Sequence, residues 1–474
     1  MQNELIVKSK DDIIRFVDQN PTKKRTLLLI LIALGGIFLD AYDLTILGTA
    51  TDQLTSEFNL SPFALSSIMT IMPIGALIGA LIGGVFTDRF GRKLMFLIDL
   101  ILLALSAAGA ALAPNPEWLF VFRFLMGLGI GLDMPIALSF IAEFSNSKTR
   151  GRNVNYWQVF WYIATVSSTL IVMGLYALNT GDSLWRWSVG FGAVIAVIVL
   201  VLRLIFLGES PMWAAKNLSL KEAAKVLENT YNVSVKLEQQ PGLVQEKRNK
   251  EIEKSLLKVI FNKKYRPRTI LASVIAATQG MEYYAVGLYI PLIAVFVVGE
   301  GKLESLTGTA LINVAGIIGA FVGAQLTIKY GTRKIAIFGY LIVLLSMVLI
   351  GIVYGNGISM WLTVALISLF IFGHSAGPGP QGKTIGTLSY PTILRGYGTG
   401  FVEASSRVGG MIGTFAFPII LNAVGLAGTM LILTFAPIVG LITSLIIKWD
   451  PVGKDIEQEE EEIVQYLEDQ KASV

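Results

Sequence analysis

Long apolar runs dominate this sequence and restrict what it can fold into. Of its 474 residues, 53% are hydrophobic and 15% are charged, whereas a soluble domain carries about 25% charged residues. A helix that crosses a bilayer needs about 20 apolar residues. Twelve stretches meet this requirement: 26–50, 61–86, 93–113, 117–143, 151–178, 185–207, 269–298, 305–328, 334–354, 360–390, 396–423 and 427–447.

The apolar stretches predict helices. The run from Val194 to Leu202 is apolar at every position, which excludes the alternating pattern of membrane β-strands. We therefore predict an all-α membrane protein with twelve transmembrane helices, embedded in a lipid bilayer.

The stretches fall into two groups of six. The polar segment between them contains Ser219 and Glu222, a capping-box signal for a short helix. The tail is rich in glutamate, and we expect it to stay solvated or to form a marginal exposed helix. The predicted parts are an N-terminal segment 1–25, a six-helix bundle 26–207, a linker 208–268 with short helices, a second bundle 269–447 and an acidic tail 448–474.

Basic residues predict the orientation. Most of the 38 lysines and arginines lie in the two ends and in the even-numbered loops. Because positively charged loops stay inside the cell, we expect both termini to be cytoplasmic and the protein to be a multi-pass protein of the plasma membrane.

Composition also argues against several kinds of chemistry. The chain has no cysteine and a single histidine, His374, so disulfides, thiolate catalysis and a zinc site are not expected. We expect no enzymatic activity, no cofactor, no metal and no nucleic-acid partner.

Two motifs recur at equivalent places in the two groups. The segment Asp88–Lys93 follows the second stretch, and Ile328–Lys334 follows the eighth. An Arg-Gly pair starts at Arg150 after the fourth stretch and at Arg395 after the tenth. The repeat predicts two pseudo-symmetric six-helix bundles with a cavity between them, as in many secondary transporters.

Three motifs resemble the major facilitator superfamily over nearly the whole chain. They are the loop Gly84–Lys93, the pattern Arg123-x-x-x-Gly127-x-Gly129-x-Gly131, and the segment Gly208–Trp213. The second and third resemble sugar porters and related metabolite–proton symporters. This resemblance implies the major facilitator fold and transport of a small polar metabolite by alternating access.

The resemblance does not select one branch. Gln158, Gln279 and Gly379-Pro380 resemble sugar porters, whereas Asp40-Ala-Tyr-Asp43 and Arg407-Val-Gly resemble aromatic-acid/proton symporters. Asp133 resembles a residue of phosphate/proton symporters.

Two positions depart from the sugar-porter pattern. Leu388 replaces a glutamate, and Ile328 replaces an acidic residue. We therefore expect a thinner cytoplasmic charge network, with fewer ion pairs, in the C-terminal half.

Buried carboxylates are candidates for proton coupling. Burying an unpaired carboxylate in a bilayer costs several kcal/mol of free energy. Each buried carboxylate is therefore expected to face a cavity, to have a partner or to be protonated. The resemblance implies that Asp43 couples protons with Arg123 as its partner. The alternatives are a structural ion pair for Asp43, a buried carboxylate at a proline kink for Asp133, and a cavity wall for Glu282. The proton-coupling candidates are Asp43, Asp40, Asp133, Arg123 and Glu282.

Lys383 stands where similar sugar porters carry an aromatic residue. A compact positive charge favours an anion, although Lys383 could instead snorkel to an interface. Arg407 lies four residues after Glu403, so it could form an intrahelical ion pair or bind a substrate carboxylate. The substrate-binding candidates are Gln158, Gln279, Tyr283, Tyr289, Lys383 and Arg407.

Charged residues at cytoplasmic helix ends are predicted to lock an inner gate through ion pairs, or else only to set the orientation. These gate candidates are Asp88, Arg89, Arg92, Glu143, Arg150 and Arg395. His374 is more often a structural group than a proton relay in such a position.

The sequence thus predicts a secondary active transporter that couples protons to a small-molecule substrate. The favoured substrate is an organic anion or phosphate. The alternatives are a sugar/proton symporter, a sugar uniporter and a nutrient sensor that does not transport. We expect a monomer.

Overall fold

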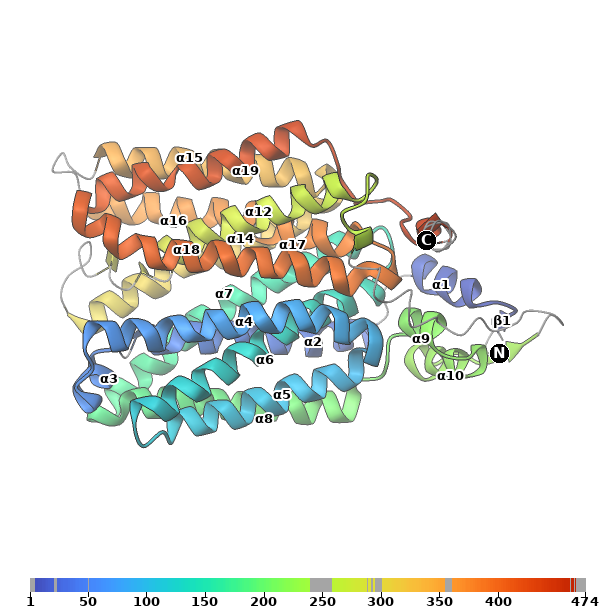
Figure 1. The fold of residues 1–474 in the computed structure, drawn as a ribbon, viewed down its shortest axis with the longest axis horizontal. Coiled ribbons are helices and arrows are strands. Elements are labelled where there is room, and N and C mark those ends of the chain that lie inside the picture. The colour runs from blue at the N-terminus through green and yellow to red at the C-terminus, as the bar shows by residue number, and fades with distance from the viewer. Residues whose placement is uncertain are drawn as a thin grey trace.

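The structure, a computed structural model, describes residues 5–20, 24–49, 51–238, 258–287, 289–290, 293–294, 301–353, 360–460, 462–463 and 465. The long helices lie side by side in one bundle, and the marked N and C ends lie beyond the same end of it (Figure 1). We call this end the terminal end.

The N-terminal half forms six long helices. They are α2 (Lys24–Ile46), α4 (Pro62–Phe90), α5 (Arg92–Ala111), α6 (Pro116–Glu143), α7 (Arg150–Ala177) and α8 (Leu184–Phe206). Shorter helices beside them are η1 (Leu47–Thr49), α3 (Thr51–Phe58) and η2 (Gly181–Ser183).

The C-terminal half is built in the same way. Its helices are α12 (Arg266–Val286), α14 (Lys302–Tyr330), α15 (Thr332–Val353), α16 (Met360–Ala376), α17 (Pro378–Leu388), α18 (Thr392–Leu433) and α19 (Phe435–Ile446).

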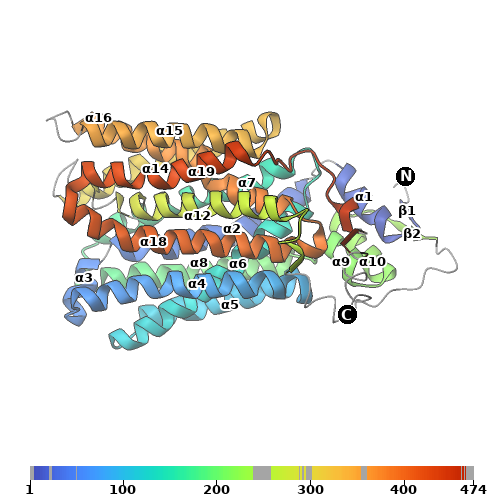
Figure 2. The same ribbon diagram turned by 45° about the horizontal axis from the view of Figure 1, so that its top comes forward.

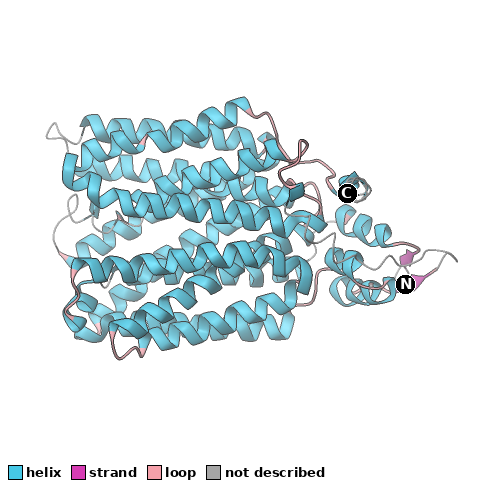
Figure 3. Cartoon of the chain, in the orientation of Figure 1, coloured by secondary structure: helices cyan, strands magenta, loops and turns pink. Residues whose placement is uncertain are grey.

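Ten helical segments of the described chain are long and apolar enough to cross a membrane. The longest, Thr392–Ile446, has 55 residues and contains two spans, because the chain leaves helical geometry at Gly425 (φ 68°, ψ −179°). Helix α12 packs against α18 as the first long helix of the C-terminal half, and α16 and α17 together form one span. The predicted twelve-helix, all-α fold is confirmed, and Figure 3 shows the predominance of helix. The predicted span 269–298 continues beyond α12 into residues that lie mostly outside the described part.

Glycines allow close helix packing within the N-terminal half. A Cβ atom on Gly127 would lie 2.0 Å from the carbonyl oxygen of Met72, and one on Gly131 would lie 2.2 Å from that of Ala76. Any larger residue would force α6 away from α4. The glycine pattern of α6 therefore serves helix packing.

The sequence repeat has a structural counterpart at the terminal end. Gly91 (φ 93°) and Gly331 (φ 83°) make the same turn between two helices. In each half, a carboxylate from a distant segment accepts a hydrogen bond from the next helix. Glu209 accepts from the backbone N–H of Arg92 at 2.9 Å, and Asp450 accepts from that of Arg333 at 2.9 Å.

Short elements pack together outside the bundle at the terminal end (Figures 1 and 2). They are β1 (Leu5–Val7), α1 (Lys10–Gln19), α9 (Pro211–Asn217), α10 (Leu220–Tyr231) and β2 (Val235–Leu237). The strands β1 and β2 pair in parallel. The predicted capping box of Ser219 and Glu222 starts α10, and residues 239–257 of the linker lie outside the described part.

Candidate functional site

The candidate site lies where the two halves meet. Helix α4 packs against α18, and α7 packs against α14. Asn155 on α7 donates a hydrogen bond to Thr327 at 2.8 Å and accepts one from Thr384. Deeper along α7, Trp161 Nε1 donates to the Tyr283 hydroxyl on α12 at 2.9 Å. These polar contacts join helices of opposite halves.

Asp43 and Arg123 are neighbours, as the resemblance implied. Both side chains are buried, and Arg123 donates to the main-chain carbonyl of Asp43 at 3.2 Å. Neither carboxylate oxygen of Asp43 has a hydrogen-bond partner among the described residues. Arg123 is thus held beside Asp43 while the carboxylate remains available to a proton.

Asp40 lies one turn before Asp43 on α2 and is completely buried. Its carboxylate oxygens also have no hydrogen-bond partner in the described part of the chain. The charged groups acting on it are Asp133, Arg407, Asp43 and Arg203. Charged groups of both halves therefore act electrostatically on Asp40.

Asp133 forms an ion pair that our sequence interpretation missed. Arg203 on α8 contacts the Asp133 carboxylate at 2.9 Å and that of Asp99 at 3.3 Å. The signal was present, because Asp99 and Arg203 are isolated charges within apolar runs. Such charges within membrane spans usually pair with each other.

Glu282 pairs with the single histidine of the chain. The Nδ1 atom of His374 lies 3.0 Å from Glu282 Oε1, and both side chains are buried. The imidazole stacks on the ring of Tyr283, with centroids 5.0 Å apart. The second oxygen of Glu282 has no hydrogen-bond partner among the described residues.

The other predicted substrate residues occupy different surroundings. Gln158 is buried on α7, beside Gly379. Gln279 donates to Ser406 Oγ at 2.9 Å and is already engaged within the C-terminal half. Tyr289 donates to the Thr414 carbonyl at 3.2 Å and stacks on Phe417. Gln158 therefore adjoins the opposite half, whereas Gln279 and Tyr289 contact neighbours in their own half.

Lys383 and Arg407 share one carboxylate. Glu403 lies 2.7 Å from the Lys383 amine and 2.8 Å from the Arg407 guanidinium, and all three side chains are buried. The Lys383 amine also lies 4.3 Å from the ring centre of Trp157, across the interface. The ion pair of Glu403 and Arg407, one of the two alternatives, is present. Neither cation is unpaired.

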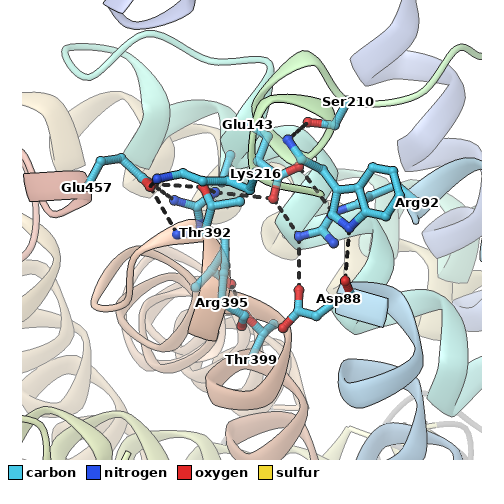
Figure 4. Close-up of polar contacts among 12 residues, drawn as sticks. Asp88, Arg92, Glu143, Ser210, Lys216, Thr392, Arg395, Thr399 and Glu457 are labelled. Atoms are coloured by element: carbon cyan, nitrogen blue, oxygen red, sulfur yellow. Dashed lines mark hydrogen bonds and ion pairs between the residues drawn. The ribbon is translucent and has the colours of Figure 1, made fainter. Parts of the chain in front are cut away.

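A charge network closes the terminal end (Figure 4). Arg92 contacts Glu143 at 2.6 Å and Asp88 at 3.0 Å, and Arg395 from the other half contacts Glu143 at 3.3 Å. Asp88 also accepts a hydrogen bond at 3.3 Å from the backbone N–H of Tyr397 on α18. The network therefore connects α4 and α6 of one half with α18 of the other.

The acidic tail completes this network, contrary to two expectations. Glu457, in the short helix η4 (Glu457–Glu459), contacts Arg395 at 2.5 Å and Lys216 at 3.9 Å. Burial opposes ionisation of Glu457, but these cations outweigh it and lower its pKa to about 2. The described part of the tail, up to Glu460, is docked by ion pairs and is not a solvated segment. The network of the C-terminal half is not thinner, because Glu457 supplies a carboxylate for Arg395.

Two gate candidates lie apart from this network. Arg89 is exposed, and its guanidinium lies over the ring of Phe90. Arg150 forms an ion pair with Asp18 of α1 and donates to the Ala142 carbonyl at 3.0 Å. Arg150 therefore anchors the N-terminal helix, and Arg89 has no ion-pair partner among the described residues.

The described residues contain no group of three or more histidine and acidic side chains that could hold a metal ion. The buried groups at the interface are carboxylates, two cations and hydrogen-bonding side chains. Such groups suit proton exchange and recognition of a polar solute.

Comparisons with known proteins agree with this architecture. The putative metabolite transport protein YaaU of Escherichia coli is 28% identical over 90% of this chain and 92% of its own length. The arabinose-proton symporter of Bacillus subtilis is 26% identical over 90% of this chain and 92% of its own length. A structure of the proton:xylose symporter XylE superposes with a TM-score of 0.76 at 18% identity, covering 93% of this chain and 99% of that one.

The comparisons favour the sugar alternative over the organic anion or phosphate that we had preferred from the sequence. They also agree with the expectation that the chain is a membrane transporter and not an enzyme. Residues 28–462 match the family described as "Sugar (and other) transporter". The chain belongs to this family of the major facilitator superfamily.

Proposed function

We propose that this protein is a proton-coupled symporter of a neutral sugar or a similar polyol. It works in the plasma membrane by alternating access, as a monomer and without a cofactor, and its terminal end faces the cytoplasm. The arabinose-proton symporter among its sequence relatives and the proton:xylose symporter among its structural neighbours support the substrate class.

The ion pairs of Glu403 with Lys383 and Arg407 are the observation that favours a neutral substrate. Lys383 and Arg407 are both within 2.8 Å of this carboxylate, and Asp40 is a further acid near Arg407. Both cations are therefore already paired with a carboxylate of the protein. An anionic substrate would have to displace Glu403 and leave a buried carboxylate without a partner, which is costly.

Unpaired hydrogen-bonding atoms support recognition of hydroxyl groups. Trp157 Nε1 and Glu282 Oε2 are buried without a hydrogen-bond partner among the described residues, and the Gln158 amide lies between α7 and Gly379. A buried polar atom without a partner costs about 1–3 kcal/mol. A sugar hydroxyl that donates or accepts at these atoms removes that cost.

Asp43 supports the coupling to protons. Its carboxylate is buried and unpaired by hydrogen bonds, yet Arg123 lies beside it. Burial favours the protonated form and the guanidinium favours the ionised form. A movement that changes the distance between them changes the proton affinity, and this links protonation to alternating access.

The charge network and the α4–α18 contact support a state that is closed toward the cytoplasm. A Cβ atom on Gly84 would lie 2.1 Å from the carbonyl oxygen of Gly396, so the two helices touch through their backbones. Inward opening must separate this contact and break the pair of Glu143 with Arg395, which joins the two halves.

The test is internal pH in proteoliposomes after external addition of one solute. The panel is xylose, arabinose, glucose, galactose, 4-hydroxybenzoate and phosphate, and empty liposomes correct for passive leakage. Acidification with a sugar and not with the anions is expected. Acidification only with an anion contradicts the neutral substrate, and labelled sugar that equilibrates without acidification means uniport. Solute that binds but never crosses the membrane means a sensor.

A further inference from the structure

A basic groove opens at the terminal end of the C-terminal half, and the transport mechanism makes no use of it. The groove has a volume of about 400 Å³. It lies where α14 ends at Tyr330, α15 begins at Thr332 and the chain continues beyond the end of α19 at Ile446. Five cations and one carboxylate line it, which leaves an excess of four positive charges: Lys329, Arg333, Lys334, Lys448, Lys454 and Asp450.

The protein itself occupies the carboxylate of Asp450. This side chain accepts hydrogen bonds from the Thr332 hydroxyl at 3.1 Å and from the backbone N–H groups of Arg333 at 2.9 Å and Val452 at 3.1 Å. Asp450 thus holds the start of α15 and does not pair with a lysine. Among the described residues, none of the five cations of the groove has an ion-pair partner.

The other half of the molecule lacks this concentration of charge. In the matching turn of the N-terminal half, the exposed cations are Arg89 and Lys93. Beyond α8 the chain has no lysine or arginine over residues 207–215, whereas Lys448 and Lys454 follow α19. The preference for positive charge on one side of a membrane acts on both halves. The excess in the C-terminal half therefore indicates a local anionic ligand.

An exposed apolar stripe leads from the groove into the membrane span. Phe338, Leu341 and Leu345 of α15 are 65%, 50% and 55% exposed, and they lie on the same helix face as Lys334, at successive turns after it. Tyr330, which lines the groove, is half-exposed at the end of α14, and tyrosine is enriched where a membrane meets water. The groove thus lies at the level of lipid headgroups, and the stripe lies at the level of acyl chains.

We propose that this groove binds the headgroup of an anionic phospholipid from the leaflet at the terminal end. Clusters of lysine and arginine beside a membrane span recognise anionic lipids through their charge, and a lysine amine is a compact partner for phosphate. A zwitterionic lipid has no net charge and leaves the excess uncompensated. A free phosphate compensates it but gains nothing from the apolar stripe. The proposal is independent of the substrate and of proton coupling.

The same lipid stabilises the start of the acidic tail. Lys448 and Lys454 flank Asp450 on the segment that connects α19 with Glu457, and Glu457 pairs with Arg395. A headgroup that contacts both lysines holds this segment in place. Bound lipid should therefore raise the melting temperature of the protein.

Native mass spectrometry of the purified full-length protein tests the site without any substrate. After removal of bound lipid, the protein is given phosphatidylglycerol or phosphatidylcholine with the same acyl chains. Phosphatidylglycerol should remain bound at several-fold higher occupancy. Equal occupancy of the two lipids overturns the proposal. Glycerol 3-phosphate should displace phosphatidylglycerol only in large excess, and displacement at equal concentration overturns the lipid as the ligand.

Two matched double variants locate the site. Lys329→Gln/Lys334→Gln removes two exposed cations from the groove, and Arg89→Gln/Lys93→Gln removes two from the matching turn of the other half. Both variants change the net charge equally. Only the first should lose the preference for phosphatidylglycerol and the rise in melting temperature that this lipid produces. Equal losses in both variants, or a loss in the second alone, overturn the assignment to the groove.

Discussion

Glu457, from the acidic tail, contacts Arg395 of α18 at 2.5 Å, and Arg395 also contacts Glu143 of the opposite half at 3.3 Å. The arginine therefore joins three parts of the chain that are far apart in sequence. Glu457 also reaches Lys216 in the linker at 3.9 Å. Glu457 is thus one of several tail carboxylates that bind the terminal end, beside Glu459, which contacts Arg268 at 2.9 Å, and Glu460, which pairs with Lys216.

Replacing Glu457 should loosen the terminal end. Glu457→Gln leaves Arg395 with one acidic partner fewer, and removal of one partner of a buried ion pair costs about 3–5 kcal/mol. The chain has no cysteine. A single Thr399→Cys, at a buried position of α18 one turn after Arg395, therefore reports opening through its rate of maleimide labelling. Labelling should be faster in Glu457→Gln. Glu462→Gln, an exposed tail position, is the control and should leave the rate unchanged.

The same contact should respond to acid. The pKa of Glu457 is lowered from an ordinary value of 4.5 to about 2. A lowered pKa means that its stabilising effect is complete above pH 4.5 and is lost as the pH falls toward 2. The labelling rate of Thr399→Cys should therefore rise as the pH falls below about 4.5, measured with a probe that reacts in acid. A Glu457→Gln background should remove that part of the rise.

Gly84→Ala should disturb the closed state. The added methyl group would lie 2.1 Å from the Gly396 carbonyl oxygen, so α4 and α18 must separate. We expect faster labelling of the same cysteine reporter and a shift toward the inward-open state. Gly174→Ala, where nothing lies within 4 Å, is a matched control. Equal labelling rates in the two variants would contradict the closed-gate interpretation.

Glu403→Gln should be strongly destabilising, because it leaves Lys383 and Arg407 buried without their shared partner. Removal of one member of a buried ion pair costs about 3–5 kcal/mol. The double variant Lys383→Met/Glu403→Gln restores the balance between Arg407 and Asp40, so its melting temperature should recover part of the loss. A double variant less stable than Glu403→Gln would refute this account.

Asp43→Asn should separate sugar movement from proton movement. Without a carboxylate beside Arg123 there is no group to take up and release the proton, so sugar-driven acidification should disappear. Exchange of labelled for unlabelled sugar should persist. Unimpaired acidification in Asp43→Asn would exclude this residue from coupling, and Asp182→Asn is the control for expression and reconstitution.

Two adjacent glycines of α2 differ in how close they lie to the buried ion pairs of Arg203 with Asp133 and Asp99. A methyl group on Gly36 would lie 2.1 Å from the Arg203 guanidinium and 2.5 Å from Asp133, whereas one on Gly35 meets only Val199 at 3.4 Å. Gly36→Ala should therefore lower the melting temperature, and Gly35→Ala should leave it nearly unchanged. Equal melting temperatures of the two variants would contradict the close contact of Gly36 with these ion pairs.

Much of this architecture follows from the sequence alone. Apolar runs longer than a bilayer crossing can be satisfied only as helices, and the two groups of six and the repeated glycine turns at Gly91 and Gly331 predict two related bundles. The positions of Asp43 and Arg123 also followed from their motifs. These features depend on residues that are close together in the sequence or that recur with a fixed period, so they can be read from the sequence alone.

Pairing between distant charges was decided only by the tertiary structure. The sequence offers Glu403 as a partner for Arg407, four residues further on, but only the packing of α17 against α18 brings Lys383 to the same carboxylate. In the same way, Arg203 is 70 residues from Asp133, and Glu457 is 62 residues from Arg395. Electrostatic energy depends on separation in space and on burial, and neither quantity is written in the order of residues along the chain.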